Sequence, residues 1–336
     1  MQLKLSVLDQ TPIRKGSDAS EALQESIELA KLADEAGYTR YWLSEHHNSI
    51  TLAGAAPEVF IARLGAETKR IRLGSGGIML PNHSALKVAE NFRLLEALYP
   101  HRIDLGIGRA PGTDRITSQL LNPSNNFAPE EYIQQVRDLA AFITETPDSG
   151  NLEGKITAIP SVESAPDLWI LTSSGESAWL AAHSGTGLSY AQFINPVGGP
   201  EAIRLYKQRF KPSETLSHPQ TNVGIFAFCS ESEEKVQQFK ALMDYRLTSF
   251  EKGQFNKFYN YNDIKDYQYT EAEKQRLLYH HNRYIAGTPG EVKEKFIELA
   301  KSFDTDEIVV ATFADKKEDR LESYRLMARA FLDVRC

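Results

Sequence analysis

Apolar and polar positions along this chain repeat in a unit: an amphipathic helix, a short polar or glycine turn, and an apolar run rich in strand formers. Residues 19–36 show the unit well, because alanine, leucine and isoleucine recur at helical spacing on one face. Asp18 and Glu21 have the spacing of a capping box, and Gly37 ends the helix. The apolar run at 41–43 then predicts a strand.

The same unit recurs along the whole chain. Apolar runs predict strands near 3–8, 40–44, 71–75, 103–107, 168–172, 187–191, 222–228 and 307–312. Helical spacing predicts helices near 19–36, 57–67, 84–98, 130–144, 174–183, 199–210, 231–250, 290–302 and 317–332. Eight strands that alternate with helices predict an α/β fold with a parallel sheet closed as a (β/α)8 TIM barrel. We expect residues 1–336 to form this single domain.

An open, doubly wound sheet is the alternative fold. Gly106 and Gly108 follow a predicted strand, as the glycines of a dinucleotide-binding turn would. The spacing is GxGxxxG with Pro111 inside it, and no strand that ends in Asp or Glu follows about 20 residues later. The sequence around these glycines therefore does not match a dinucleotide-binding motif, and the barrel is favoured.

Two segments interrupt the alternation. Residues 145–166 are rich in proline, glycine and serine, which indicates an insertion before the fifth strand. Residues 251–285 are rich in tyrosine, phenylalanine, asparagine and charge, and they lie between the seventh and eighth predicted strands. Long loops in compact domains are often functional, so we expect 251–285 to form a lid over the carboxyl end of the barrel; a solvated surface excursion is the alternative.

Composition excludes several classes of protein. The 336 residues contain 41% hydrophobic side chains and carry a net charge of −7, so no basic surface for nucleic acid is expected. Neither a signal peptide nor a membrane-spanning run is present, which predicts a soluble cytoplasmic protein. Cys229 and Cys336 are too few for a disulfide framework or a metal site.

Candidate site residues follow the predicted strands. His46 and His47 end the second strand, where barrel enzymes concentrate their chemistry, and strand alternation lets only one of them face the barrel axis. A structural histidine is equally consistent with this position. No HxH or HExxH motif is present, so we predict no metal ligands. His83, after the third strand, is interpreted as a local hydrogen-bonding residue.

Further candidates surround the expected pocket. The glycine run 74–77 would let the backbone approach a flat ligand, and Arg109 follows the fourth strand, where a guanidinium can hold phosphate. The hydroxyls of Ser173, Ser174 and Ser177, at the start of the helix after the fifth strand, could add to a phosphate site or simply cap that helix. Thr11 follows the first strand and Gln192 follows the sixth, and both should line the mouth of the pocket.

These motifs, over most of the chain, resemble those of the bacterial luciferase-like, flavin-dependent monooxygenases. The resemblance rests on Trp42-Leu43-Ser44-Glu45-His46-His47 and on residues 72–115. It implies that His46 lies near the reactive face of the flavin, as a general acid or base or in support of a flavin hydroperoxide. It also implies that Arg109, Ser173, Ser174 and Ser177 hold the FMN phosphate, and that a cis bond between Gly76 and Gly77 lies against the isoalloxazine ring.

The sequence also departs from the luciferases. Gly108 replaces their reactive cysteine, and the run after Arg102 looks like an alkanal-monooxygenase-like branch, so light emission is not implied. The resemblance implies oxygenation of a small organic substrate by O2 and reduced FMN from a separate reductase, in a homodimer formed by helices 57–67 and 84–98. Two alternatives remain: an F420-dependent oxidoreductase and a non-catalytic flavin-binding protein.

Overall fold

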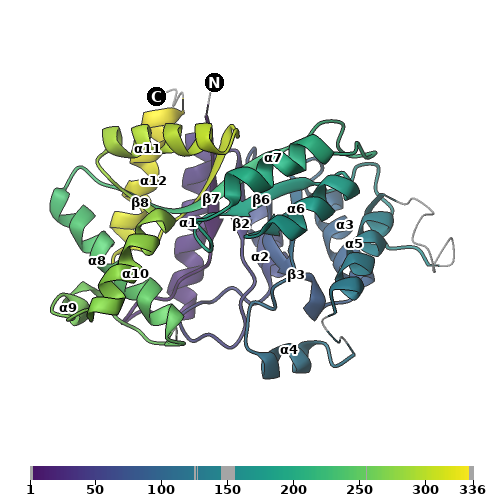
Figure 1. The fold of residues 1–336 in the computed structure, drawn as a ribbon. Helices are drawn as coiled ribbons and strands as arrows, with labels where there is room; N and C mark the ends of the chain where they lie inside the picture. The colour runs from purple at the N-terminus through teal and green to yellow at the C-terminus, as the bar shows by residue number, and fades with distance from the viewer. Residues whose placement is uncertain (1–2, 125, 127, 145–155, 255, 333–336) are drawn as a thin grey trace.

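The computed structural model describes residues 3–124, 126, 128–144, 156–254 and 256–332. Eight parallel strands form a closed barrel with helices on its outside (Figure 1). The barrel strands are β1 (Lys4–Asp9), β2 (Arg40–Leu43), β3 (Arg72–Met79), β4 (Ile103–Gly108), β5 (Asp167–Thr172), β6 (Gly187–Ala191), β7 (Thr221–Cys229) and β9 (Glu307–Ala311).

Closure of the barrel is visible in the strand pairing. β1 lies between β2 and β9, with Val7 opposite both Tyr41 and Val310. β7 pairs with β6 on one side and with β9 on the other, which completes the ring. The predicted (β/α)8 barrel is confirmed, and the open doubly wound sheet is wrong.

The helices begin and end where local sequence signals place them. The Asp18 side chain accepts a hydrogen bond from the Glu21 N–H at 2.9 Å, and Gly37 ends the helix with a φ of 83°. The described helices are α1 (Ala19–Ala36), α2 (Pro57–Glu67), α3 (Ala85–Leu98), α4 (Arg115–Leu121), α5 (Pro129–Thr144), α6 (Gly175–Ser184), α7 (Gly199–Arg209), α8 (Glu233–Glu251), α9 (Tyr261–Ile264), α10 (Glu271–His280), α11 (Pro289–Ser302) and α12 (Lys317–Phe331), with the short 3-10 helices η1 (Leu80–Asn82) and η2 (His281–Arg283).

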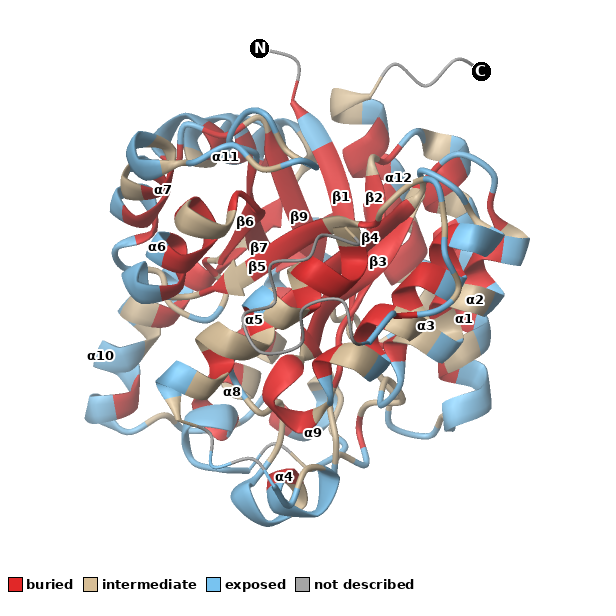
Figure 2. Ribbon diagram, turned by 90° about the vertical axis from the view of Figure 1, so that its right-hand side faces the viewer, coloured by how far each residue is buried: buried red, intermediate tan, exposed pale blue. Residues whose placement is uncertain are grey.

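The barrel strands are buried along most of their length (Figure 2). Strand alternation divides their apolar side chains into two layers. Val7 and Tyr41 belong to the large outer layer, which the surrounding helices cover. Leu8 and Trp42, the next residues along the same strands, belong to a second cluster that fills the barrel interior. Apolar side chains therefore fill both the space between the barrel and its helices and the inside of the barrel.

Buried charge fills the amino end of the barrel. Arg40, at the start of β2, donates to Asp104 at 2.7 Å and to Glu307 at 2.6 Å, and its guanidinium lies 4.6 Å from the Trp169 ring centroid. These buried charges are therefore paired with one another inside the barrel.

The structure adds one strand to the predicted set. β8 (Tyr284–Gly287) pairs with the second half of β7, where Phe226 lies opposite Tyr284, and it does not take part in closing the barrel. A strand of four residues at the end of a polar segment gives too short an apolar run to be recognised.

The segment 251–285 lies at the carboxyl end of the barrel. Asn256 donates to the Asn48 carbonyl at 2.9 Å, and Arg283 donates to the Phe193 carbonyl at 2.7 Å, so the segment contacts the loops after β2 and β6. The expected position is confirmed, whereas opening and closing as a lid stay a prediction. Of the insertion at 145–166, residues 145–155 lie outside the described part, and 156–166 contain no helix or strand.

None of the helices within the described ranges is both long and apolar enough to cross a membrane.

Candidate active site

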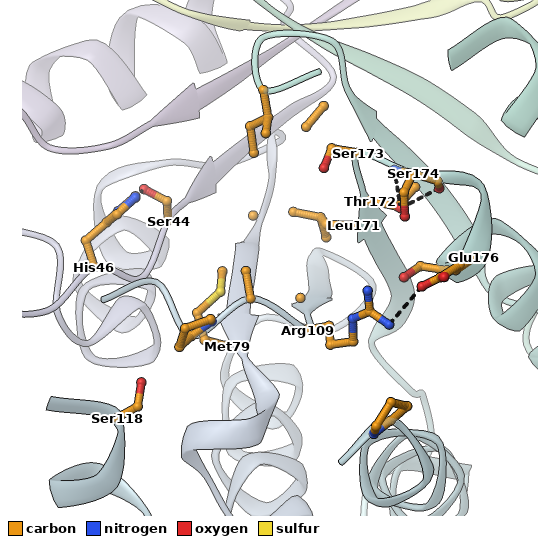
Figure 3. A pocket seen from close by; sticks show the side chains of 18 of the residues that line it. Ser44, His46, Met79, Arg109, Ser118, Leu171, Thr172, Ser173, Ser174 and Glu176 are labelled. Carbon is orange, nitrogen blue, oxygen red and sulfur yellow. Dashed lines mark hydrogen bonds and ion pairs between the residues drawn. The ribbon is translucent and has the colours of Figure 1, made fainter. Parts of the chain in front are cut away.

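A large cavity of about 1190 Å3 opens at the carboxyl ends of the barrel strands (Figure 3). Residues at or after the ends of β1 to β6 line it, as barrel enzymes require. Its apolar surface includes Leu8, Met79, Leu171 and Phe193. A flat, largely apolar ring system is the kind of ligand that such a surface can bind.

His46 lines this cavity. β2 ends at Leu43, and the His46 N–H then donates to the Gly54 carbonyl at 2.8 Å, which fixes the loop. The ring Nδ1 lies 3.1 Å from the Ser44 hydroxyl, so Nε2 is the nitrogen left for a ligand. Burial, and next the nearby positive charge of Arg246, lower the pKa of His46 to about 4. The imidazole is therefore neutral near neutral pH, and it can donate or accept a hydrogen bond.

His47 turns away from the cavity toward Glu45. Its Nε2 lies 2.7 Å from Glu45 Oε1, which also lies 2.8 Å from His83 Nε2. Although burial alone would raise it, the pKa of Glu45 falls to about 2 because both histidines and the Met79 N–H bond its carboxylate. Of the two histidines, His46 lines the cavity and His47 does not, although both lie in the loop after β2 and not in the strand. His83 is a local hydrogen-bonding residue, as predicted.

Arg109 and the start of α6 lie next to each other on one side of the cavity, and His46 lies on the opposite side (Figure 3). Ser174 is the N-cap residue of α6, but its hydroxyl caps no backbone N–H, so the first-turn donors are left for a ligand. Arg109 Nη1 lies 3.2 Å from Glu176 Oε2, and the two side chains are 45% and 77% exposed. An ion pair this exposed is weak, and a phosphate dianion can replace its carboxylate.

The other phosphate candidates lie beside this pair. Ser173, Ser174 and Ser177 all line the cavity, and Ser177 is buried. The residues on this side fit a phosphate: a guanidinium, hydroxyls and an uncapped helix N-terminus supply donors and positive potential. The structure thus brings together the four residues that the resemblance assigns to the phosphate.

The glycine run differs from the prediction in one respect. The bond between Gly76 and Gly77 is cis, as expected, but the run lies inside β3, which extends to Met79, and not in a turn after it. Gly76 lines the cavity. Gly77 does not, and a Cβ there would lie 2.6 Å from the Gly106 carbonyl oxygen. Its small size is needed for close packing of β3 against β4.

Thr11 and Gln192 are not among the cavity-lining residues, which corrects the prediction for both. Thr11 has a φ of 50° and a buried side chain, and this turn leaves Gln10 to line the cavity. The Gln192 amide donates to the Asn282 carbonyl at 3.1 Å and so joins the loop after β6 to η2. Strand periodicity fails at both positions because β1 and β6 have already ended.

The sequence prediction missed α4, which lies at the mouth of the cavity. Arg115, Ser118 and Gln119 from this helix line it. The signal that could have located the helix is Asp114, whose side chain accepts from the N–H groups of Ile116 and Thr117 at 3.0 and 3.1 Å. Seven residues are too few for clear helical periodicity.

No metal arrangement accompanies these groups: the described ranges contain no group of three or more His, Cys, Asp or Glu side chains that could hold a metal ion.

Comparison with known proteins identifies the family. The model of the luciferase-like monooxygenases matches residues 3–306. The chain belongs to this family. It is 45% identical to the uncharacterised protein YwcH of Bacillus subtilis, with 98% of this chain and all of YwcH covered. It is 31% identical to the N-acetyl-S-alkylcysteine monooxygenase of the same organism, with 98% of each chain covered.

Solved structures agree with the family fold. Apo-MsnO8 is 36% identical, with a TM-score of 0.88 over 98% of both chains. The oxygenating constituent of 3,6-diketocamphane monooxygenase from Pseudomonas putida, in complex with FMN, is 16% identical, with a TM-score of 0.70 over 98% of both chains. An F420-dependent secondary alcohol dehydrogenase is 14% identical, with a TM-score of 0.67 over the whole of both chains. The last two are similar in fold alone.

Proposed function

We propose that this protein is an FMN-dependent monooxygenase. It takes reduced FMN from a separate reductase and uses O2 to add one oxygen atom to a small organic substrate. The observation that carries the proposal is one cavity with His46 on one side and the Arg109 and α6 donors on the other, joined by an apolar surface. This spacing of a polar end, an apolar middle and an imidazole suits a phosphorylated flavin.

The phosphate would bind between Arg109 and the first turn of α6. The Arg109 guanidinium would leave the Glu176 carboxylate and bind the phosphate. The hydroxyls of Ser173, Ser174 and Ser177 would donate further hydrogen bonds to the phosphate oxygens. The ring would lie along Gly76 and the apolar side chains. Bound reduced flavin supplies the electrons that activate O2.

His46 would act on the substrate side of the ring. Its Nδ1 is held by Ser44, and its low pKa keeps the ring neutral, so Nε2 can hold or move one proton without adding a charge to the cavity. Leu8, Met79 and Leu171 would exclude water around the same place. The relative named for N-acetyl-S-alkylcysteine supports a sulfur compound as the substrate, with aldehydes and ketones as the other classes to test.

Substitution of Arg109 tests the phosphate site. We expect Arg109→Ala to weaken FMN binding at least about tenfold, because a charge-assisted contact with phosphate contributes about 1.5–3 kcal/mol. Fluorescence titration of FMN measures the dissociation constant. Arg204→Ala is the matched control, since Arg204 forms an exposed ion pair with Glu201 on α7, remote from the cavity lining. Equal affinity in the wild type and in Arg109→Ala would remove Arg109 from the site.

A homodimer is part of the proposal. Its interface would use α2 and α3, whose sequences contain the small residues Ala62, Ala66, Ala85 and Ala89. Ala85 and Ala89 are buried, whereas Ala66 is exposed. The large exposed apolar residues of these helices are Val59, Leu94 and Leu98. Light scattering at micromolar concentration should give twice the chain mass, and a monomer would contradict the proposal.

A further inference from the structure

A second cavity, of about 220 Å3, lies beside the first at the carboxyl end of the barrel. Its walls come from the loop after β1, from α8, from the segment 257–262 and from the loop after β9. The walls combine aromatic and cationic side chains. They include Arg246, Lys257, Phe313, Asp315 and Lys316.

Positive charge exceeds negative charge in this second cavity, although the whole chain carries −7. Of its cations, Arg14 is paired with Glu25, and Lys15 is paired with Asp263 at 2.6 Å. Arg246, Lys257 and Lys316 form no ion pair with any carboxylate in the described ranges. Asp315 is the one carboxylate of the lining, and it already accepts from the Tyr261 N–H at 2.7 Å. An anionic ligand would balance the remaining charge.

Arg246 is the cation best placed to receive such a ligand. Its guanidinium lies 3.6 Å from the Phe313 ring centroid, so it is held flat against the wall and is partly buried. Lys257 and Lys316 are exposed, where water and salt screen their charge. A planar guanidinium can also bond both oxygens of a carboxylate, which an ammonium cannot do in the same geometry.

A row of packed aromatic rings lies between the linings of the two cavities. The Phe313 ring centroid lies 5.6 Å from that of Phe226, which lies 5.0 Å from that of Phe193. Phe193 lines the first cavity, together with His46. The charge of Arg246 also contributes to the lowered pKa of His46.

We infer that the second cavity binds the carboxylate of the substrate through Arg246, and that the substrate is a small organic acid. Its apolar part would lie along Phe313 and Phe193, which line the two cavities, and its reacting atom would point toward His46. The inference rests on the proposed function, because it assigns the substrate class of the same active site.

Isothermal titration of the flavin-free full chain with phenylacetate and phenylacetamide tests this inference, since the two probes differ mainly in charge. We expect the wild type to bind the acid at least about tenfold more tightly than the amide. Arg246→Gln should lose this preference, and Arg246→Lys should keep part of it. Lys316→Gln, which changes an exposed cation of the same cavity, should keep all of it.

The inference would be overturned if the wild type showed no preference for the acid, or if Arg246→Gln kept the full preference. It would also be overturned if only Arg115→Gln lost the preference, because the acid would then bind in the first cavity. Folding is checked by the melting temperature and by FMN affinity, both of which should be unchanged in Arg246→Gln. If FMN does not bind at all while the preference depends on Arg246, the anion site stands and the proposed oxygenation fails.

Discussion

Replacement of His46 by alanine should lower the yield of oxygenated product at least about 100-fold, the lower range for loss of a general acid or base. FMN binding should remain close to that of the wild type, because the phosphate residues lie on the opposite side of the cavity. Oxygen uptake should continue, and hydrogen peroxide should replace product. Product and peroxide are measured together after reduced FMN is supplied.

His47→Ala is the matched control for this experiment. His47 lies 2.7 Å from Glu45 and does not line the cavity, so His47→Ala should lower the product yield less than His46→Ala does. A wild-type product yield from the His46 variant would refute the assignment, and a loss in the His47 variant alone would move the role to His47.

The pH profile gives a second readout for His46. The imidazole stays neutral down to about pH 4, because burial and the charge of Arg246 outweigh the opposing charge of Glu45. Product formation should therefore show no step from His46 between about pH 5 and 8, where an unperturbed histidine would titrate.

Arg320→Met should reduce the free energy of unfolding by about 3–5 kcal/mol, the cost of breaking a buried charge network by removing one partner. The Arg320 guanidinium on α12 donates to Asp9 at 2.6 Å, to Glu25 at 2.9 Å and to the Thr312 carbonyl at 3.1 Å. Its loss leaves the carboxylate of Asp9 buried with no cation in contact.

Thermal unfolding measures this effect. With an unfolding entropy of about 2.1 cal/mol/K per residue, the expected loss corresponds to a decrease in Tm of roughly 4–7 °C for a chain of 336 residues. Arg325→Met is the control on the same helix, since Arg325 is 46% exposed and pairs only with Glu322 at 3.3 Å; its cost should be about 0–1 kcal/mol. Equal melting temperatures for the two variants would contradict the account of the network.

The fold was largely predictable from the sequence, because burial on both faces gives barrel strands such as β5 and β9 a continuous apolar run. The run at 187–191 matches β6 to the residue, and the helix at 19–36 matches α1. The missed elements include β8 and α9, with four residues each, and α4, with seven, which are too short to show a clear period. The ten-residue α10 was also missed, because its sequence is mostly polar. The cytoplasmic location stays a prediction.

The site was predictable where a residue follows directly from its place on the barrel. Strand ends placed His46 and Arg109 at one rim, since parallel strands bring their carboxyl ends together. The prediction that Thr11 lines the cavity was wrong because a threonine gives no indication that its φ is positive. Arg246 was missed because its contact with Phe313 joins residues far apart in sequence. Such contacts depend on packing and not on local pattern.

The most direct test of the central claim is an anaerobic titration of the purified protein with reduced FMN and with F420, followed by flavin fluorescence and absorbance. We expect reduced FMN to saturate one site per chain, with an affinity that falls at least about tenfold in Arg109→Ala, and we expect F420 not to displace it. Tighter binding of F420, or no saturable binding of reduced FMN, would contradict the proposal that this barrel is an FMN-dependent monooxygenase.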